Sequence, residues 1–150
     1  IKMDVAKQVN AADEYLELDR QNPEEQWKKF KEDNPLGFDV VVEASGSAKL
    51  LADSIHLVRP GGTLALYAIY GEVQVQWPAT LIFMNEIRII GTVGQANTFP
   101  RAVAYMDSGK INVKGMISRI YTHSEFESAL EALNDKQFMK VAVKPDTVAQ

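Results

Sequence analysis

Cysteine is absent from this chain of 150 residues, and positive charge is in deficit. Without cysteine there is no disulfide, no thiol nucleophile and no thiolate ligand for a metal ion. The formal net charge of −4 gives no reason to expect a nucleic-acid partner. No apolar run is long enough to cross a bilayer, so we expect no membrane partner either. The remaining composition, 46% hydrophobic and 24% charged, is that of an ordinary globular protein.

Apolar strands alternate with helices in the middle of the chain. Asp39–Ala44 is a continuous β-branched run, typical of a strand buried on both faces of the sheet. A helix is predicted over Ala48–Val58, and Arg59–Gly62 is interpreted as the stop that ends it. Thr63–Ala68 and Ile87–Val93 are the next predicted strands. This strand–helix–strand order predicts an α/β fold with right-handed crossovers.

Periodicity and turn residues predict the remaining elements. Helices are expected over Ile1–Val9, Glu24–Asp33, Pro100–Ser108 and Ser124–Asn134. Strands are expected over Tyr15–Leu18, Glu72–Trp77, Met116–Tyr121 and Met139–Lys144. Asn10 and Gly109 are expected to end two of the helices, and Ser124 with Glu127 is interpreted as a capping box.

Parallel α/β sheets that bind a dinucleotide carry a glycine-rich turn after their first strand, but no Gly-x-Gly-x-x-Gly occurs here. The chain also opens at Ile1 inside a predicted helix, so we expect a fragment. In the strand order 3-2-1-4-5-6, Tyr15–Leu18 would be strand three and Asp39–Ala44 strand four. The expected fold is therefore an incomplete Rossmann-type parallel sheet that lacks its first two strands. Asp39–Ala44 should then present an unpaired edge.

The segments that follow the strands are the candidate binding residues, because ligands of parallel sheets bind beyond the carboxyl ends of the strands. Ala44-Ser45-Gly46 serves equally well as a ligand contact or as a purely structural turn. Ala68-Ile69-Tyr70-Gly71 is, from its residues alone, better interpreted as a plain connector. His56 and His123 belong to no metal-ligand pattern, so we predict no metal ligand within this chain.

Two runs, Phe38–Gly46 and Arg59–Leu64, resemble the medium-chain dehydrogenase/reductase superfamily. Further stretches resemble its sorbitol (polyol) dehydrogenase branch, namely Asn97–Pro100, Asn112–Lys114 and Phe126–Ala132. The resemblance covers nearly all of this chain but well under half of a full-length member. It implies an NAD(P)-dependent oxidoreductase of a small alcohol or polyol, usually zinc-dependent and homo-oligomeric. We expect the protein to be cytoplasmic. The resemblance also implies that the zinc ligands, the glycine-rich turn and the acid that selects NAD over NADP all lie upstream of this segment, and that no catalytic residue lies within it.

The resemblance also implies which positions contact the cofactor, NAD or NADP. The backbone beside the adenosine half is that of Ala44, Ser45 and Gly46. The backbone facing the nicotinamide is that of Ala68, Ile69, Tyr70, Thr92, Val93 and Gly94. Two basic residues complete the set: Lys2, which reaches the ribose, and Lys140, which reaches the pyrophosphate.

The substrate site departs from the sorbitol dehydrogenase pattern. Those enzymes have an Arg-Tyr pair just before the Asn-Thr-aromatic-Pro motif, and Gly94 and Gln95 stand there instead. Neither offers the charged fork of a guanidinium group, so we expect a different or smaller alcohol. Two alternatives stay open: a zinc-free reductase of enones or quinones from the same superfamily, and a non-catalytic fragment that acts as an interaction or structural protein.

The resemblance divides the chain into three parts. Residues 1–114 are expected to form part of the dinucleotide-binding domain, residues 115–145 to return to the catalytic domain, and residues 146–150 to form a tail. Ile87–Val93 is last in the predicted sheet, which makes it the candidate edge for subunit pairing. The alternative interpretation is an edge covered by Ala79–Met84.

Overall fold

A computed structural model describes residues 2–19, 21–94 and 97–146 and divides the chain into two compact units. The sheet unit, residues 18–96, contains a three-stranded sheet with its helices. The terminal unit joins residues 1–17 to residues 97–150 and contains a two-stranded sheet. Within the described ranges, no helix is long and apolar enough to span a bilayer.

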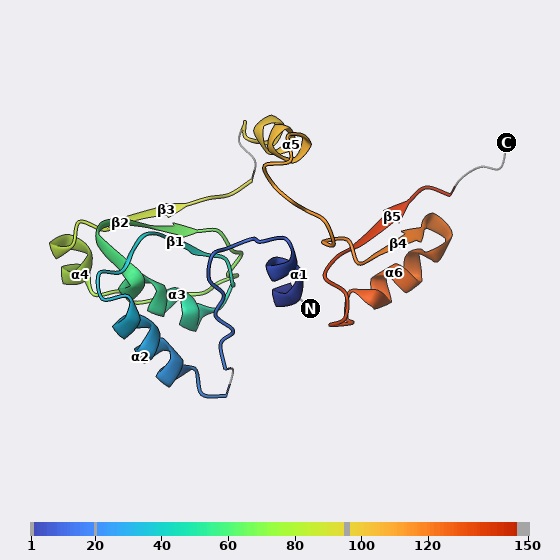
Figure 1. Ribbon diagram of the computed structural model, residues 1–150. Coiled ribbons are helices and arrows are strands. Elements are labelled where there is room, and N and C mark those ends of the chain that lie inside the picture. The colour runs from blue at the N-terminus through green and yellow to red at the C-terminus, as the bar shows by residue number, and fades with distance from the viewer. Residues whose placement is uncertain (1, 20, 95–96, 147–150) are drawn as a thin grey trace. The chain divides into compact units, whose positions relative to one another are not determined.

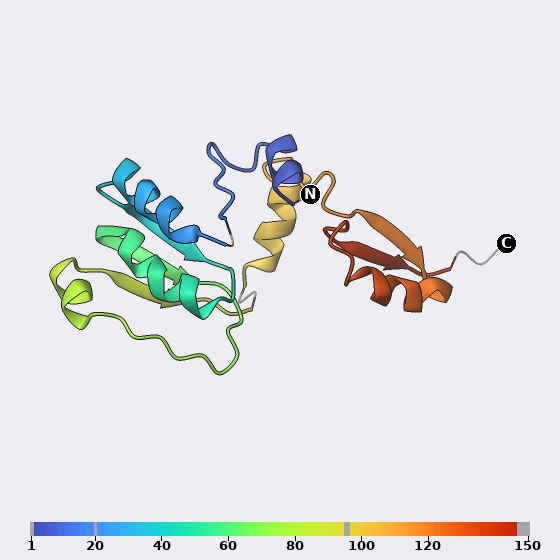
Figure 2. The ribbon, with the colours of Figure 1, turned by 90° about the horizontal axis from the view of Figure 1, so that it is seen from below.

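Three parallel strands form the centre of the sheet unit in the order β1-β2-β3 (Figure 1). The strands are β1 (Phe38–Glu43), β2 (Val58–Leu66) and β3 (Arg88–Gly91). The helical segments are α2 (Pro23–Asp33), α3 (Ala48–Ser54), the 3₁₀ turn η1 (Ile55–Leu57) and α4 (Ala79–Met84). Both ribbon views show α2 and α3 on the same face of the sheet (Figure 2).

The strand register decides which side chains reach the core. It sets two rows of residues across the sheet, Val41–Leu64–Ile89 and Val42–Ala65–Ile90. Because successive side chains point to opposite faces, the first row packs around the fully buried Ile55 and Leu64, while Val42 in the second row is 60% exposed. The prediction that Asp39–Ala44 is buried on both faces is therefore wrong. α2 and α3 cover only one face, and among the described strands β1 pairs only with β2, which leaves the expected open edge.

Arg59-Pro60-Gly61-Gly62 lies inside β2, which corrects its interpretation as a simple helix stop. The preceding 3₁₀ turn does end at Leu57, but the strand begins at once. Pairing then advances two residues along β1 while it advances five along β2, so the extra residues form a bulge. A Cβ atom on Gly62 would lie 2.7 Å from Cγ1 of Val58, so the glycine permits this close approach.

The terminal unit contains a second parallel strand pair. β4 (Arg119–Thr122) and β5 (Val141–Lys144) are connected through α6 (Phe126–Ala132), and Tyr121, Ala129 and Ala132 are buried between them. The remaining segments of this unit are α1 (Lys2–Gln8), α5 (Phe99–Asp107) and the 3₁₀ turn η2 (His123–Glu125). Asn10, at φ +53°, and Gly109, at φ +71°, adopt the left-handed backbone predicted for helix ends.

The capping box of the terminal unit lies two residues before its predicted place. Thr122, not Ser124, is the first residue of the box. The Thr122 backbone N–H donates to the Glu125 carboxylate at 2.9 Å, and the Thr122 hydroxyl donates to the same oxygen at 2.8 Å. The acceptance of these bonds lowers the pKa of the Glu125 carboxyl. Thr122–Glu125 and Ser124–Glu127 both have the spacing of a capping box, and the early 3₁₀ turn selects the first.

Two predicted strands are irregular. Tyr15–Leu18 forms no strand, because its tyrosine folds the segment back on α1: the phenol donates to the Ala6 carbonyl and accepts from the Ala12 N–H, each at 3.0 Å. Glu72–Trp77 has the alternation of a strand but no neighbouring strand, and the ring of Trp77 packs against the core. Alternating residues form a strand only where another backbone pairs with them.

The predicted α/β class with parallel sheets is confirmed. The division at residues 114 and 145 stays a prediction, and the tail beyond residue 146 lies outside the described residues.

Candidate functional site

The three strands of the sheet unit end side by side at one edge of the sheet. Glu43 of β1 is paired with Leu66 of β2, and Leu66 with Gly91 of β3. The segments that follow these residues hold nine of the predicted cofactor positions: Ala44, Ser45, Gly46, Ala68, Ile69, Tyr70, Thr92, Val93 and Gly94. We call these segments, residues 44–46, 67–70 and 92–94, the strand-end edge.

Backbone hydrogen bonds connect these segments to the neighbouring strand. The Tyr67 N–H donates to the Glu43 carbonyl oxygen at 2.8 Å. One strand along, the N–H and hydroxyl of Thr92 donate to the Leu66 carbonyl at 3.0 and 2.9 Å. Each segment therefore leaves the sheet in a defined direction instead of diverging freely.

Gly46 brings the first segment into contact with the second. Its φ of +75° belongs to the left-handed region that glycine adopts without strain, and a Cβ atom there would lie 3.1 Å from the Ile69 carbonyl oxygen. The turn after β1 thus leaves room for another backbone, as the turns of nucleotide-binding sheets do for a ligand.

Apolar side chains stand fully in solvent at the same edge. Ile69 and Val93 are each 95% exposed, and Tyr67 is 67% exposed. A planar organic ring needs apolar contacts on its face and polar groups at its rim. Exposed apolar side chains and the backbone groups of these segments can offer both. That a nicotinamide or adenine ring binds at this edge stays a prediction.

Glu43 is the residue of this edge that sequence reasoning missed. It is the last residue of β1 and only 6% exposed. Its Oε1 accepts the Ser45 N–H at 2.9 Å and the Ser45 hydroxyl, while its Oε2 accepts the Tyr70 hydroxyl. The sequence does contain a signal for it, namely a single acid at the end of a run of valines. A carboxylate buried in such a strand needs hydrogen-bond partners, which would have pointed to a role for Glu43.

These bonds determine how the two side chains titrate. Burial alone raises the pKa of the Glu43 carboxyl, but hydrogen bonds from Ser45, Tyr70 and the Gly46 backbone outweigh it, so the pKa is lowered. Burial, the hydrogen bond to Glu43 and its negative charge raise the pKa of the Tyr70 phenol to about 12. At neutral pH the carboxylate is therefore ionised and the phenol keeps its proton.

Between pH 10 and 12, Tyr70→Phe is expected to lose less of its free energy of unfolding than the unmodified chain does. The folded-state pKa of about 12 lies above the ordinary 10.0, so the folded protein holds this proton more tightly than the unfolded chain. That contribution is complete below pH 10 and disappears as the pH rises through 12. Urea unfolding at several alkaline pH values should show a steeper loss in the unmodified chain than in Tyr70→Phe. Tyr67→Phe is the control that should behave as the unmodified chain, and parallel losses in all three would refute the expectation.

A family model described as zinc-binding dehydrogenase matches residues 2–108. This chain belongs to the zinc-binding dehydrogenase family. It is 50% identical over 147 residues to D-arabinitol dehydrogenase 1 of Uromyces fabae, with 97% of this chain and 42% of that protein covered. It is 28% identical over 148 residues to the sorbitol dehydrogenase of Bacillus subtilis, with 97% of this chain and 41% of that protein covered. The chain thus spans about two fifths of the length of these relatives, and the polyol dehydrogenase resemblance is confirmed.

The fold agrees with this assignment. An alcohol dehydrogenase from Escherichia coli CFT073, solved with NADH, superposes on this chain with a TM-score of 0.79 at 18% identity. The superposition covers 93% of this chain and 40% of that protein. At that identity the likeness shows the fold alone.

Two predicted cofactor positions, Lys2 and Lys140, fall outside the strand-end edge. Lys2 in α1 and Lys140 just before β5 belong to the terminal unit, where both are exposed, and their cofactor role stays a prediction. Gln95, one of the two positions at which the sequence departs from the sorbitol dehydrogenase pattern, lies outside the described residues.

The family's metal has no site in the described part of the chain. No group of three or more His, Cys, Asp or Glu side chains that could hold a metal ion occurs there. Residues 2–19, 21–94 and 97–146 therefore do not fit a zinc ion, and no chemistry of this chain is assigned to one.

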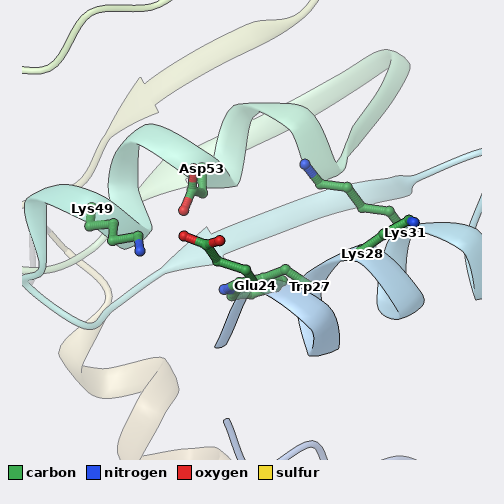
Figure 3. Close-up of a pocket in the computed structure, with 6 residues that line it drawn as sticks. All are labelled: Glu24, Trp27, Lys28, Lys31, Lys49 and Asp53. Atoms are coloured by element: carbon green, nitrogen blue, oxygen red, sulfur yellow. The ribbon is translucent and has the colours of Figure 1, made fainter. Parts of the chain in front are cut away.

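A pocket of about 360 Å³ lies between α2 and α3, and none of its residues belongs to the strand-end edge (Figure 3). It is lined by Glu24, Trp27, Lys28, Lys31, Lys49 and Asp53. The Trp27 indole nitrogen is buried there without a hydrogen-bond partner. Charged side chains of both signs surround the indole, and this mixture favours no particular class of ligand. The strand-end edge therefore remains the candidate site.

Proposed function

We propose that this chain is the C-terminal portion of an NAD(P)-dependent polyol dehydrogenase that transfers hydride from a small polyol to nicotinamide. The observation that carries the proposal is the 50% identity to D-arabinitol dehydrogenase 1 along 97% of this chain. The strand-end edge supports it, because three parallel strands end there beside glycine backbone and exposed apolar side chains.

The proposed role of this chain is to hold the cofactor. The segment 44–46 faces the adenosine half, and the segments 68–70 and 92–94 face the nicotinamide, which carries the hydride when it is bound. Lys2 and Lys140 are proposed to reach the ribose and the pyrophosphate. The rest of the polypeptide is proposed to supply the zinc ion and the glycine-rich turn.

We propose a pentitol, with D-arabinitol as the first candidate, as the substrate. The named relative is a D-arabinitol dehydrogenase. The resemblance to sorbitol dehydrogenases implies that Gly94 stands at the place of their polyol-binding arginine. An arginine fork binds polyol hydroxyls in a fixed geometry, and its replacement by glycine removes those contacts.

The first experiment is an intact mass of the native protein followed by an alcohol panel. We expect a mass well above 16.7 kDa, the mass of this chain, and NAD- or NADP-linked oxidation of D-arabinitol with at least tenfold higher kcat/KM than of sorbitol. Failure to oxidise any polyol, combined with NADPH-dependent reduction of quinones, would favour the zinc-free reductase. A native mass of 16.7 kDa with no cofactor binding would favour a non-catalytic interaction protein.

We also propose that the protein is a cytoplasmic homo-oligomer whose subunits pair along β3. This strand is last in the sheet, and Ile90 on it is 47% exposed, whereas Ile89 packs against the core. Ile90→Lys is expected to dissociate the oligomer, because a charge on an edge strand opposes pairing. Light scattering should show a smaller particle for Ile90→Lys and an unchanged one for the neutral control Ile90→Thr. An unchanged mass in the lysine variant would exclude this edge as the interface.

A further inference from the structure

Glu43 and Tyr70 join two segments of the strand-end edge that are far apart in the sequence. The Tyr70 hydroxyl donates to Oε2 of Glu43 and lies 3.3 Å from the Glu43 carbonyl oxygen. Oε1 of the same carboxylate accepts from the backbone and hydroxyl of Ser45. One side chain therefore contacts both the turn after β1 and the segment after β2.

The segment that Tyr70 belongs to has little other regular structure. Residues 67–78 contain neither helix nor strand, and Ile69 next to Tyr70 is 95% exposed. An irregular segment with exposed side chains needs specific bonds to hold one conformation. Tyr70 supplies such bonds with its side chain, because its hydroxyl is directed at the buried carboxylate of Glu43.

The bond joins the two segments at the place where their backbones come close. Gly46 lies against the Ile69 carbonyl, one residue before Tyr70. If the Tyr70–Glu43 bond were lost, residues 68–70 could move away from residues 44–46, and the edge would no longer present both segments to one ligand.

We propose that Glu43 and Tyr70 are positioning residues that hold the segments after β1 and β2 in the arrangement that binds the nicotinamide cofactor. The inference rests on the proposed function, since it assigns the bond a role in the same site. Neither side chain is a catalytic residue, because the phenol and the carboxylate satisfy each other.

The test is a double-mutant cycle in the native protein with NADH as the probe. Tyr70→Phe and Glu43→Gln should each weaken NADH binding about tenfold by fluorescence titration, because each removes the same charge-assisted bond. The double variant should bind no more weakly than the worse single variant, since the partners act together. The KM for NAD should rise while kcat at saturating NAD stays within about twofold.

A second readout needs no ligand. Amide hydrogen exchange of residues 67–70 in the cofactor-free protein should speed up in Tyr70→Phe. It should stay unchanged in Tyr67→Phe, because Tyr67 is 67% exposed. Tyr70→Phe removes one oxygen atom, so it should fold even if Glu43→Gln does not.

The outcomes separate this inference from the proposed function. If the unmodified protein binds neither NADH nor NADPH, the proposed function fails. If the unmodified protein and Tyr70→Phe bind NADH equally, the positioning role is overturned and the cofactor site stands. Lower thermal stability in Tyr70→Phe with unchanged NADH affinity and unchanged exchange at residues 67–70 would equally overturn it.

Discussion

Gly37→Ala is expected to lower the free energy of unfolding of the sheet unit by about 3 kcal/mol, which combines left-handed backbone strain with overpacking. Gly37 has a φ of +75°, and a Cβ atom there would lie 2.8 Å from the Leu57 carbonyl oxygen and 2.9 Å from the Arg59 nitrogen. Both neighbours are backbone atoms, one at the end of η1 and one at the start of β2, so they cannot move aside as a flexible side chain could. Chemical denaturation with circular dichroism measures the change.

Gly71→Ala is the matched control for this variant. Gly71 belongs to the same unit and has a φ of +63°, but nothing lies within 4 Å of its Cβ position. It should lose only about 1 kcal/mol, the cost of a left-handed side chain. Equal losses at the two positions would show that crowding at the start of β2 contributes nothing.

Gly46→Val is expected to weaken NADH binding about 100-fold in the native protein, which corresponds to about 2.7 kcal/mol. A β-branched residue at a φ of +75° is a strong backbone outlier, and its Cβ would press on the Ile69 carbonyl at 3.1 Å. The turn after β1 and the segment after β2 would have to separate, and both are proposed to contact the cofactor. Fluorescence titration with NADH measures the effect.

Gly71→Val separates this effect from general strain. It places valine in the same backbone region, in the loop after β2, where nothing crowds its Cβ. It should lower stability but change NADH affinity by less than about threefold. If Gly71→Val weakened binding as much as Gly46→Val, the contact between Gly46 and Ile69 would have no particular role.

The strand-end edge could be predicted because its signals are local. A β-branched run followed by Ala44-Ser45-Gly46 identifies a strand and the turn that leaves it, and the rule for parallel sheets gives the edge where ligands bind. The structure brings the three predicted segments to one edge for this reason. That they bind a cofactor stays a prediction.

The Glu43–Tyr70 bond could not be predicted from the sequence. Its partners are 27 residues apart, and no short pattern links an acid at a strand end to a tyrosine in a later loop. Burial on both faces of β1 was wrong for a related reason. A valine run reports that a strand is apolar, whereas the elements that cover each face lie elsewhere in the chain.

The other differences between the predicted and the observed fold arise where one local sequence pattern is compatible with two structures. Paired glycines after a helix suit a stop as well as a bulge, and only the pairing of β1 with β2 decides for the bulge. Tyr15–Leu18 had the composition of a strand, but its tyrosine hydroxyl bonds to the backbone near α1 and no strand lies beside it in the described unit.

The most direct test of the central claim is a hydrogen-exchange footprint of NADH on the native protein. The account predicts that saturating NADH slows exchange at residues 44–46, 68–70 and 92–94, the three segments that follow β1, β2 and β3. The backbone amides of α2 and α3 that line the pocket, around Trp27 and Lys49, should exchange at the same rate with and without NADH. Bound NADH that left the three strand-end segments unprotected, or that protected the α2–α3 pocket instead, would contradict it.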